Sequence, residues 1–334
     1  MKILLTGGCG FIGSHILDNY LAEGHEVTVV DNFRSGRLEN IKHQLDNKRL
    51  TCMFGDILDE NFVRSLGTDF EVVNHHAAQL EITRCIDFPQ EDITSNMIGT
   101  TNIFEHAKRC KHIKRVIYAS SAAVYGQAQS KMQKEVDPIN PHWVYGVSKY
   151  ATELLAKIYS QQLGIPFFGL RYSIVYGTRE WYGRVLTLFV KNSIRDGKVI
   201  VFGKGDEVRD FIHVKDAAGV NSILLRANSK GSTIYNVSSG KTVSIKELAE
   251  KVRDLSGCEI IFEDVKEGES SRLLNIGRIR LPGNVIYSCM DNSKAKKELG
   301  WQPTVQFDQG LREEFDWYKA QKKEDGMLWE RLFY

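Results

Sequence analysis

The sequence predicts an α/β protein with a doubly wound parallel sheet and a smaller C-terminal α/β lobe. Three observations lead to this fold class. Short apolar strands alternate with helical stretches through the first half of the chain, a glycine-rich turn directly follows the first strand, and the alternation loosens after about residue 173. Such alternation is typical of a parallel sheet with helices on both faces, where ligands bind at the carboxyl ends of the strands.

The elements of the first half follow from this alternation. Each predicted strand is a short apolar run, and each predicted helix is a longer stretch between two such runs. We expect strands at Lys2–Thr6, Glu26–Asp31, Leu50–Phe54, Val72–His75, Arg115–Ser120 and Pro166–Tyr172. We expect helices at Phe11–Glu23, Asp59–Leu66, Gln90–Arg109 and Trp143–Leu163.

The second half has a looser pattern, which we interpret as a lobe whose chain returns to the sheet at least once. Strands are expected at Val199–Phe202, Ile234–Val237 and Glu259–Glu263. Helices are expected at Lys215–Ala227, Ser244–Ser256, Asn292–Leu299 and Gln306–Lys323. The aromatic tail with Trp329, Phe333 and Tyr334 is expected to pack on the body of the protein, with a partner subunit as the alternative.

The composition is that of an ordinary globular protein. The 334 residues include 42% hydrophobic and 26% charged side chains, enough for one large domain or two lobes. The formal charge of +2 gives no electrostatic reason to expect nucleic acid or a membrane surface. No apolar run approaches the ~18 residues of a membrane span, and no signal peptide is expected. The six cysteines form no C-x-x-C motif, so we expect free thiols in the cytoplasm.

The glycine-rich turn has the composition of a dinucleotide site. Gly7 permits a tight turn, Gly10 lets the backbone approach a pyrophosphate, and Gly13 lets the helix pack closely on the strand. Phe11 and Ile12 open the helix, whose free N–H groups and partial positive charge favour phosphate. The strand–turn–helix context makes this motif specific.

The ends of the next two strands indicate which dinucleotide binds. Asp31, followed by Asn32, ends the second predicted strand near the spacing expected for a carboxylate on the adenosine ribose. Because Asp31 would repel a 2′-phosphate, the sequence favours NAD, although Arg34 leaves NADP open. Asp56, which precedes Ile57, is placed to meet the adenine, to cap the following helix, or both.

Tyr145 and Lys149 are four residues apart, and a helix brings such a pair to one face. A nearby ammonium favours the charged phenolate, so Lys149 would make Tyr145 a usable base near neutral pH. Together with the glycine-rich turn and Ser121 at the end of a strand, the pair predicts a site for hydride transfer. The His75-His76 pair is not interpreted as a metal site, because no cysteine or carboxylate cluster completes a tetrahedral set.

The stretch YASSAAVYG at residues 118–126, with the glycine turn and the Tyr145/Lys149 pair, resembles the extended short-chain dehydrogenase/reductase family. The similarity is to its branch of NAD-dependent nucleotide-sugar epimerases and dehydratases, the UDP-glucose 4-epimerase-like enzymes. Further landmarks extend the resemblance over nearly the whole chain: Asn96 before IGT at 98–100, RDFIHV at 209–214, NVSSG at 236–240 and the segment 291–301.

The resemblance implies a Rossmann-type NAD-binding domain at 1–173, to which segments 211–235 and 285–300 return, and a mainly substrate-binding lobe at 174–334. It makes Ser121 a hydrogen-bond partner of the reacting sugar oxygen, Tyr145 the acid/base and Lys149 a ligand of the nicotinamide ribose. The implied cofactor contacts are Gly7, Gly10, Phe11, Ile12, Gly13, Asp31, Asn32, Asp56, Ile57, Ala77, Ala78, Asn96, Ser120, Tyr145, Lys149 and Tyr172. The implied substrate contacts are Ser121, Ala122, Tyr145, Arg184, Arg209 and Arg280.

Two alanines bear on the reaction. The 4,6-dehydratases and sugar-acid decarboxylases of this family carry an acidic residue just before Val-Tyr-Gly, where this chain has Ala122 and Ala123. Alanine cannot move a proton, so the resemblance implies a UDP-sugar 4-epimerase acting through a transient 4-keto intermediate. The alternatives are an NAD(P)-dependent nucleotide-sugar reductase or dehydrogenase, an epimerase at another carbon, and a non-enzymatic NAD-binding protein.

Other positions depart from the family pattern. Ile174 stands where an asparagine is common, and 281–284 reads Leu-Pro-Gly-Asn instead of Arg-Pro-Gly-Asp, with Arg278 and Arg280 close enough to substitute. Arg209 would bind a pyrophosphate or form a surface ion pair. Arg184 would contact a diphosphate or a carboxylate, or would only be part of a surface loop. A homodimer through the helices at 90–109 and 143–163 is implied, with a monomer as the alternative.

Overall fold

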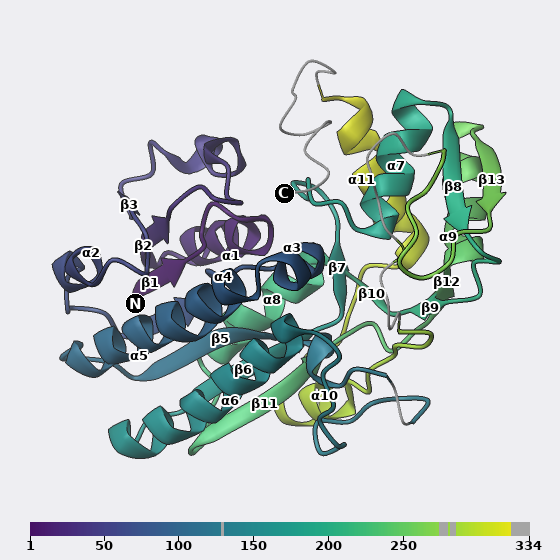
Figure 1. Ribbon diagram of the computed structural model, residues 1–334. Coiled ribbons are helices and arrows are strands. Elements are labelled where there is room, and N and C mark those ends of the chain that lie inside the picture. The colour runs from purple at the N-terminus through teal and green to yellow at the C-terminus, as the bar shows by residue number, and fades with distance from the viewer. Residues whose placement is uncertain (128–129, 274–279, 281–284, 322–334) are drawn as a thin grey trace.

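A seven-stranded parallel sheet forms the centre of the protein (Figure 1). The computed structural model describes residues 1–127, 130–273, 280 and 285–321. The sheet has the order β11-β6-β5-β4-β1-β2-β3, and every adjacent pair is parallel. Its strands are β1 Lys2–Thr6, β2 Glu26–Asp31, β3 Leu50–Phe54, β4 Val72–His75, β5 Arg115–Ser121, β6 Phe167–Tyr172 and β11 Ser232–Val237. The predicted doubly wound fold is confirmed.

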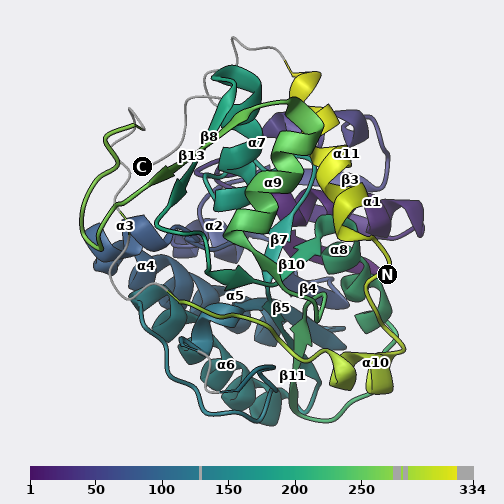
Figure 2. The ribbon, with the colours of Figure 1, turned by 90° about the vertical axis from the view of Figure 1, so that its right-hand side faces the viewer.

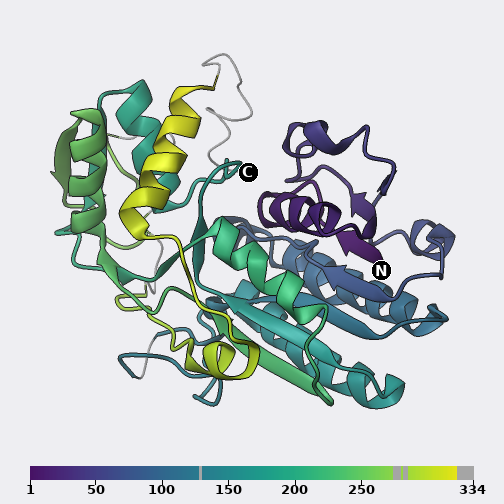
Figure 3. The same cartoon turned by 180° about the vertical axis from the view of Figure 1, so that it is seen from behind.

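Helices cover both faces of the sheet. On one face lie α1 (Phe11–Ala22) and α8 (Val214–Leu224), and on the other lie α2 (Glu60–Ser65), α5 (Gly99–Arg109) and α6 (Val144–Leu163). Figure 3 shows α1 and α8 side by side over the sheet.

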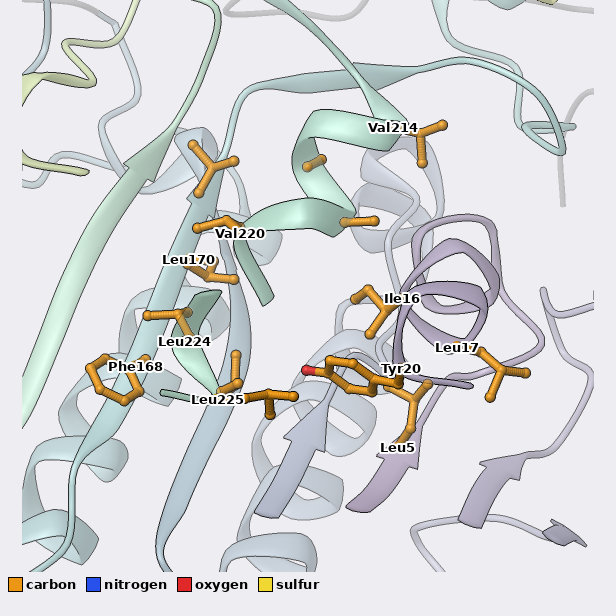
Figure 4. Close-up of a cluster of buried hydrophobic side chains, with 14 of the residues drawn as sticks. Leu5, Ile16, Leu17, Tyr20, Phe168, Leu170, Val214, Val220, Leu224 and Leu225 are labelled. Carbon is orange, nitrogen blue, oxygen red and sulfur yellow. The ribbon is translucent and has the colours of Figure 1, made fainter. Parts of the chain in front are cut away.

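Alternation within β1 divides the core between the two faces. Ile3 and Leu5 pack beneath α1 and α8, whereas Leu4 packs beneath α5 and α6. Figure 4 shows the first of these cores, where Ile16 and Tyr20 of α1 face residues of α8 and the sheet. A strand buried on both faces therefore appears in the sequence as a continuous apolar run.

The single helix predicted at Gln90–Arg109 is wrong. The chain instead forms α3 (Ile82–Asp87), α4 (Pro89–Ile93), a π-helical turn (Thr94–Ile98) and then α5. Pro89 begins α4 because it has no N–H to lose there. The wider turn places the Asn96 side chain at the backbone of Gln79, a contact that local patterning does not reveal.

The rest of the chain builds a second layer beyond the carboxyl ends of the strands (Figure 2). There β8 (Lys198–Phe202) pairs in parallel with β13 (Glu259–Glu263). The helices α7 (Val185–Arg195), α9 (Ile245–Ser256) and α11 (Phe307–Lys319) pack around this pair. The remaining elements are β7 Ile174–Tyr176, β9 Val208–Arg209, β10 Phe211–His213, β12 Val243–Ser244, α10 Ser293–Leu299 and 3₁₀ turns at Leu38–Asn40, Lys42–Gln44 and Ala122–Val124.

Helix α7 and the short strands β7, β9, β10 and β12 were not predicted. All residues from Leu186 to Ser193 of α7 are buried, including the polar Thr187, Lys191, Asn192 and Ser193, so the helix does not have the exposed polar face that is usual for a surface helix. The last helix ends at Lys319 rather than Lys323, and the aromatic tail lies outside the described residues. Among the described helices, none is long and apolar enough to cross a membrane.

Candidate active site

The glycine-rich turn joins β1 to α1 at the edge of a cavity. Gly7 has a φ of +71°, which only glycine adopts readily. A Cβ added at Gly13 would lie 2.0 Å from the carbonyl oxygen of Gly7, so backbone fills the space of a side chain. The turn is therefore compact and leaves the unpaired N–H groups at the start of α1 beside the cavity.

This first cavity runs along the carboxyl ends of the central strands. All the predicted cofactor contacts except Asn96 line it: Gly7, Gly10, Phe11, Ile12, Gly13, Asp31, Asn32, Asp56, Ile57, Ala77, Ala78, Ser120, Tyr145, Lys149 and Tyr172. Asn96 lies behind the wall, where it accepts a hydrogen bond from Gln79 N at 2.9 Å and donates to Gln79 O at 3.0 Å. It positions a lining residue and does not line the cavity.

The buried Asp31 carboxylate lies at the end of β2, in the wall of this cavity. Its two oxygens accept hydrogen bonds from the backbone N–H groups of Cys9 and Phe33, each at 2.9 Å. Burial is the main cause that raises the pKa of Asp31, and these hydrogen bonds oppose the rise. Asn32 Nδ2 donates to Asp56 at 3.0 Å, so the ends of β2 and β3 are linked.

Asp56 does not cap the next helix, and the Arg34 side chain already has a partner. Asp59, not Asp56, caps α2 by accepting from two backbone N–H groups, while Asp56 accepts from Leu58 N at 2.8 Å. Arg34 forms an ion pair with Glu91 of α4. A 2′-phosphate at this site would therefore have to compete with Glu91 for the Arg34 guanidinium.

The predicted catalytic residues converge at the other end of the cavity. Ser121 ends β5, where its hydroxyl accepts a hydrogen bond from Ala123 N at 3.1 Å and acts to lower the pKa of Tyr145. Tyr145 lies in the first turn of α6, with Lys149 one turn later. The Lys149 ammonium lies 5.8 Å from the centroid of the Tyr145 ring and donates to Ala119 O at 3.2 Å. The alcohol, phenol and ammonium groups thus share one wall.

The charge that most favours the Tyr145 phenolate is not the one that we predicted from the sequence. Burial raises the pKa of Tyr145, and the largest opposing charge is that of Arg184, followed by the hydrogen bond with Ser121. Burial lowers the pKa of Lys149 to about 8, while Asp92 acts to raise it. We expected Lys149 to lower the phenol pKa, but its ammonium lies towards the Ala119 carbonyl and the ring. Arg184 is the cation that favours the phenolate here.

A buried polar contact that sequence reasoning missed supports the first turns of α6. Asp92 of α4 is fully buried and accepts a hydrogen bond from Ser148 Oγ at 2.5 Å. Asn96 Nδ2 donates to the same Ser148 oxygen at 3.2 Å. This network fixes the turn that separates Tyr145 from Lys149, and the carboxylate balances the ammonium charge. Only the tertiary fold brings Asp92 to Ser148, so no local motif signals it.

Ser120 lines the cavity, but its hydroxyl donates to Glu153 Oε1 at 2.6 Å. Glu153 also accepts two hydrogen bonds from the buried Arg171, at 2.8 and 2.7 Å. Such a bidentate pair ties β5, β6 and α6 together behind the catalytic wall. Tyr172 contacts His76 Nε2 at 3.0 Å through its hydroxyl.

A second cavity opens from the wall with Ser121 and Tyr145 towards the C-terminal lobe. The residues that line both cavities include Ser121, Tyr145, Tyr172, Ser173, Tyr182 and Arg184. Every predicted substrate contact lines this second cavity: Ser121, Ala122, Tyr145, Arg184, Arg209 and Arg280. Arg280 donates to Glu207 at 2.8 Å and to Val265 O at 2.9 Å. Arg278 and the run 281–284 lie outside the described residues.

The segment 177–184, after β7, which we expected to add polar and aromatic side chains beside the site, supplies further lining residues. Glu180, Trp181 and Tyr182 join Arg184 in the cavity walls. The adjacent aromatic residues at 181 and 182 were the available sequence signal, but their position depends on contacts with α7 and α11.

Of the two histidines, His75 ends β4 and serves the structure, whereas His76 lines the first cavity. His75 contacts the hydroxyls of Thr6 at 2.7 Å and Thr100 at 3.0 Å through its two ring nitrogens. Within the part of the chain that the structure describes, no group of three or more His, Cys, Asp or Glu residues could hold a metal ion.

Comparison with known proteins places this site in a family. The model of the GDP-mannose 4,6-dehydratase family matches residues 4–314. A putative UDP-glucose 4-epimerase of Methanocaldococcus jannaschii is 34% identical over 323 residues, covering 95% of this chain and 98% of the relative. The chain belongs to this family of extended short-chain dehydrogenases/reductases.

Members of different activity are almost equally similar. A dTDP-glucose 4,6-dehydratase of an Actinoplanes species is 31% identical over 333 residues, covering 96% of this chain and 99% of the relative. The UDP-glucose 4-epimerase of Thermus thermophilus, solved with NAD, has a TM-score of 0.84 and 28% identity, covering 96% of this chain and all of that one. Decarboxylases also occur among the relatives. The chain is thus an enzyme of the nucleotide-sugar epimerase, dehydratase and decarboxylase family.

Proposed function

We propose that the protein is an NAD-dependent epimerase that inverts C4 of a nucleotide-diphosphate sugar, with a UDP-linked sugar favoured. The single observation that carries this choice is the wall of the second cavity. Among its described lining residues there is no Asp, Glu, His or Cys, and Ala122 and Ala123 stand next to Ser121. Loss of water or deprotonation at a second carbon needs a further acid or base, whereas epimerisation through a ketone needs only Tyr145.

The residues around the first cavity fit a dinucleotide. The Gly7–Gly13 turn has no room for side chains, the start of α1 offers N–H groups to a pyrophosphate, and the Asp31 carboxylate lies at the adenosine end. When bound, NAD would supply the two-electron chemistry, removing hydrogen from the sugar C4 and returning it. NAD is also present in the similar T. thermophilus epimerase structure.

The chain's own residues would handle the hydroxyl proton. Tyr145 Oη would take it from the C4 hydroxyl and later return it, and the Ser121 hydroxyl, in the same cavity wall, would hydrogen-bond that sugar oxygen. The Arg184 charge acts to lower the pKa of Tyr145 and so favours its phenolate. The Lys149 ammonium lies 5.8 Å from the centroid of the Tyr145 ring. Arg209, with the remaining cations of the second cavity, would bind the diphosphate. The division into a cofactor domain at 1–173 and a mainly substrate-binding lobe at 174–334 belongs to this proposal.

Product analysis tests this assignment. We expect the purified protein, without added cofactor, to interconvert UDP-glucose and UDP-galactose or the corresponding uronate or N-acetyl pair, as read by product separation. A 4-keto-6-deoxy product or released CO₂ would identify a dehydratase or decarboxylase instead. Without epimerisation, stoichiometric consumption of external NAD(P)H would favour the alternative of a reductase, and stoichiometric reduction of external NAD(P)⁺ would favour a dehydrogenase.

We further propose a cytoplasmic homodimer. All six cysteines are free, as expected for a reducing compartment. The apolar residues Val147, Leu154 and Ile158 lie on one face of α6 and are about half exposed. Ile98, in the π-helical turn that packs beside α6, is exposed as well. Exposed apolar side chains gathered on neighbouring helical elements are typical of interfaces, and a second copy of the chain would cover them.

The double substitution Leu154→Glu with Ile158→Glu is therefore expected to give a monomer, measured by light scattering. Charged side chains would have to be desolvated in the interface. Val136→Glu is the matched control, because Val136 is 89% exposed outside these helices. A dimer that persists in the double variant, or a wild-type monomer, would contradict the proposal.

A further inference from the structure

The loop that follows β2 carries a cation beside the expected ribose position. Arg34 lies three residues after Asp31 and lines the first cavity. In dinucleotide sites of this kind, a carboxylate binds the ribose 2′-hydroxyl of NAD, whereas a nearby arginine accommodates the 2′-phosphate of NADP. The forked guanidinium is well suited to a phosphate. The choice between the two cofactors therefore depends on where the Arg34 side chain lies.

The backbone of this loop is fastened at two points. Arg37 N donates a hydrogen bond to Cys9 O at 2.9 Å, which ties the loop to the glycine-rich turn. Trp181 Nε1 donates to Ser35 O at 2.9 Å, which ties it to the segment 177–184. Because the backbone is held on both sides of residue 34, the position of the guanidinium depends on the contacts of the Arg34 side chain.

Glu91 of α4 holds that side chain. Arg34 Nη2 donates to Glu91 Oε2. Glu91 is itself fixed by Arg84 of α3, whose Nε and Nη2 donate to its two carboxylate oxygens at 2.6 and 2.8 Å. The guanidinium carbon of Arg84 in turn lies 5.0 Å from the centroid of the Phe88 ring. Arg34 thus meets a carboxylate that is already ordered, so the pair loses less conformational entropy than an isolated one would.

The strength of this contact sets the size of the effect. The side chains of Arg34 and Glu91 are 44% and 34% exposed, so water screens the pair and its contribution to stability is modest. It still bears on binding, because a phosphate on the ribose would have to draw Arg34 away from Glu91. The same phosphate would also meet the Asp31 carboxylate in the cavity wall.

We propose that Glu91 determines the choice of cofactor. By holding Arg34 on α4, it leaves Asp31 as the charged group that meets the adenosine ribose, and so it disfavours a 2′-phosphate. Glu91 is a positioning residue, because it acts through Arg34 and lies outside the lining of the first cavity. This inference goes beyond the proposed function and does not depend on which carbon of the sugar reacts.

Calorimetric titration of the full chain, freed of bound nucleotide with charcoal, tests this role. The probes are 5′-AMP and adenosine 2′,5′-bisphosphate, which differ only in the 2′-phosphate. We expect Glu91→Gln to bind the bisphosphate roughly two- to fivefold more tightly than the wild type does, the range for releasing an exposed ion pair. The affinity for 5′-AMP should be unchanged, because Asp31 and the glycine-rich turn are not altered.

Two further variants separate the Arg34 contact from a change of net charge. Glu60→Gln is the matched control, because Glu60 lies on α2 and pairs with Arg64 at 3.4 Å, away from Arg34. It should bind both probes as the wild type does. In the double variant Glu91→Gln with Arg34→Gln, the gain for the bisphosphate should disappear. The proposal is overturned if Glu91→Gln shows no gain, if the double variant keeps it, or if Glu60→Gln shows the same gain.

A second measurement follows the complete cofactors. Each protein is equilibrated with equal concentrations of NAD and NADP, and the nucleotides released on denaturation are quantified. The NADP share should rise in Glu91→Gln and return to the wild-type value in the double variant, whereas an equal share in all three would contradict the proposal. If no UDP-sugar is epimerised, the proposed function fails, and these binding results still decide the role of Glu91.

Discussion

Replacing Tyr145 with phenylalanine is expected to lower kcat by about 10²–10⁴-fold, the usual contribution of a positioned acid/base group. The ring that lines the cavity would remain, while the hydroxyl that exchanges the proton would be lost. NAD released on denaturation should therefore equal that of the wild type. Steady-state kinetics and cofactor quantification measure the two effects separately.

The matched control is Tyr150→Phe. Tyr150 lies on the same helix but outside the lining of both cavities, so its turnover should match the wild type. If Tyr145→Phe kept near-normal turnover, Tyr145 would not be the acid/base. If it lost turnover and cofactor together, the substitution would have damaged the site as a whole.

Gly13→Ala is expected to abolish cofactor retention. The new Cβ would lie 2.0 Å from Gly7 O and 3.0 Å from Gly8 Cα, and these backbone atoms cannot yield as a flexible side chain can. The turn would have to open, which moves the N–H groups away from the phosphates, and overpacking of this kind commonly costs about 1–3 kcal/mol of stability. NAD content after purification and the free energy of unfolding would be measured.

Gly219→Ala provides the comparison for that variant. Gly219 lies within α8, and a Cβ there meets no atom within 4 Å. The same substitution should therefore leave NAD content unchanged, with stability equal or higher because alanine favours helix. Retention of NAD by Gly13→Ala would mean that close packing of this turn is not what creates the cofactor site.

The features that could be predicted from the sequence are local motifs, each within a short stretch of the chain. The glycine turn, the strand-end residues Asp31 and Ser121, and the Tyr145/Lys149 spacing each depend on residues close together. A parallel sheet carries all strand ends to one edge, so predicting the strands was enough to bring these residues together. Every predicted site residue except Asn96 lines one of the two cavities.

What could not be predicted depends on contacts between distant segments. Thr187 meets Glu314 only because α11 packs on α7, and Asp92 meets Ser148 only because α4 packs on α6. The charge acting on Tyr145 was misassigned for the same reason. Helical spacing places Lys149 near the phenol, but it cannot show that the chain also brings Arg184 there.

The most direct test of the central claim is to follow deuterium from UDP-glucose labelled at C4, or from whichever UDP-sugar the product screen identifies. An epimerase of the proposed kind removes the label from C4 and restores it to the opposite face of the same carbon. We therefore predict C4-deuterated epimer, with no label lost to added unlabelled cofactor. Deuterium found at C6, or exchanged into the external cofactor pool, would contradict the account.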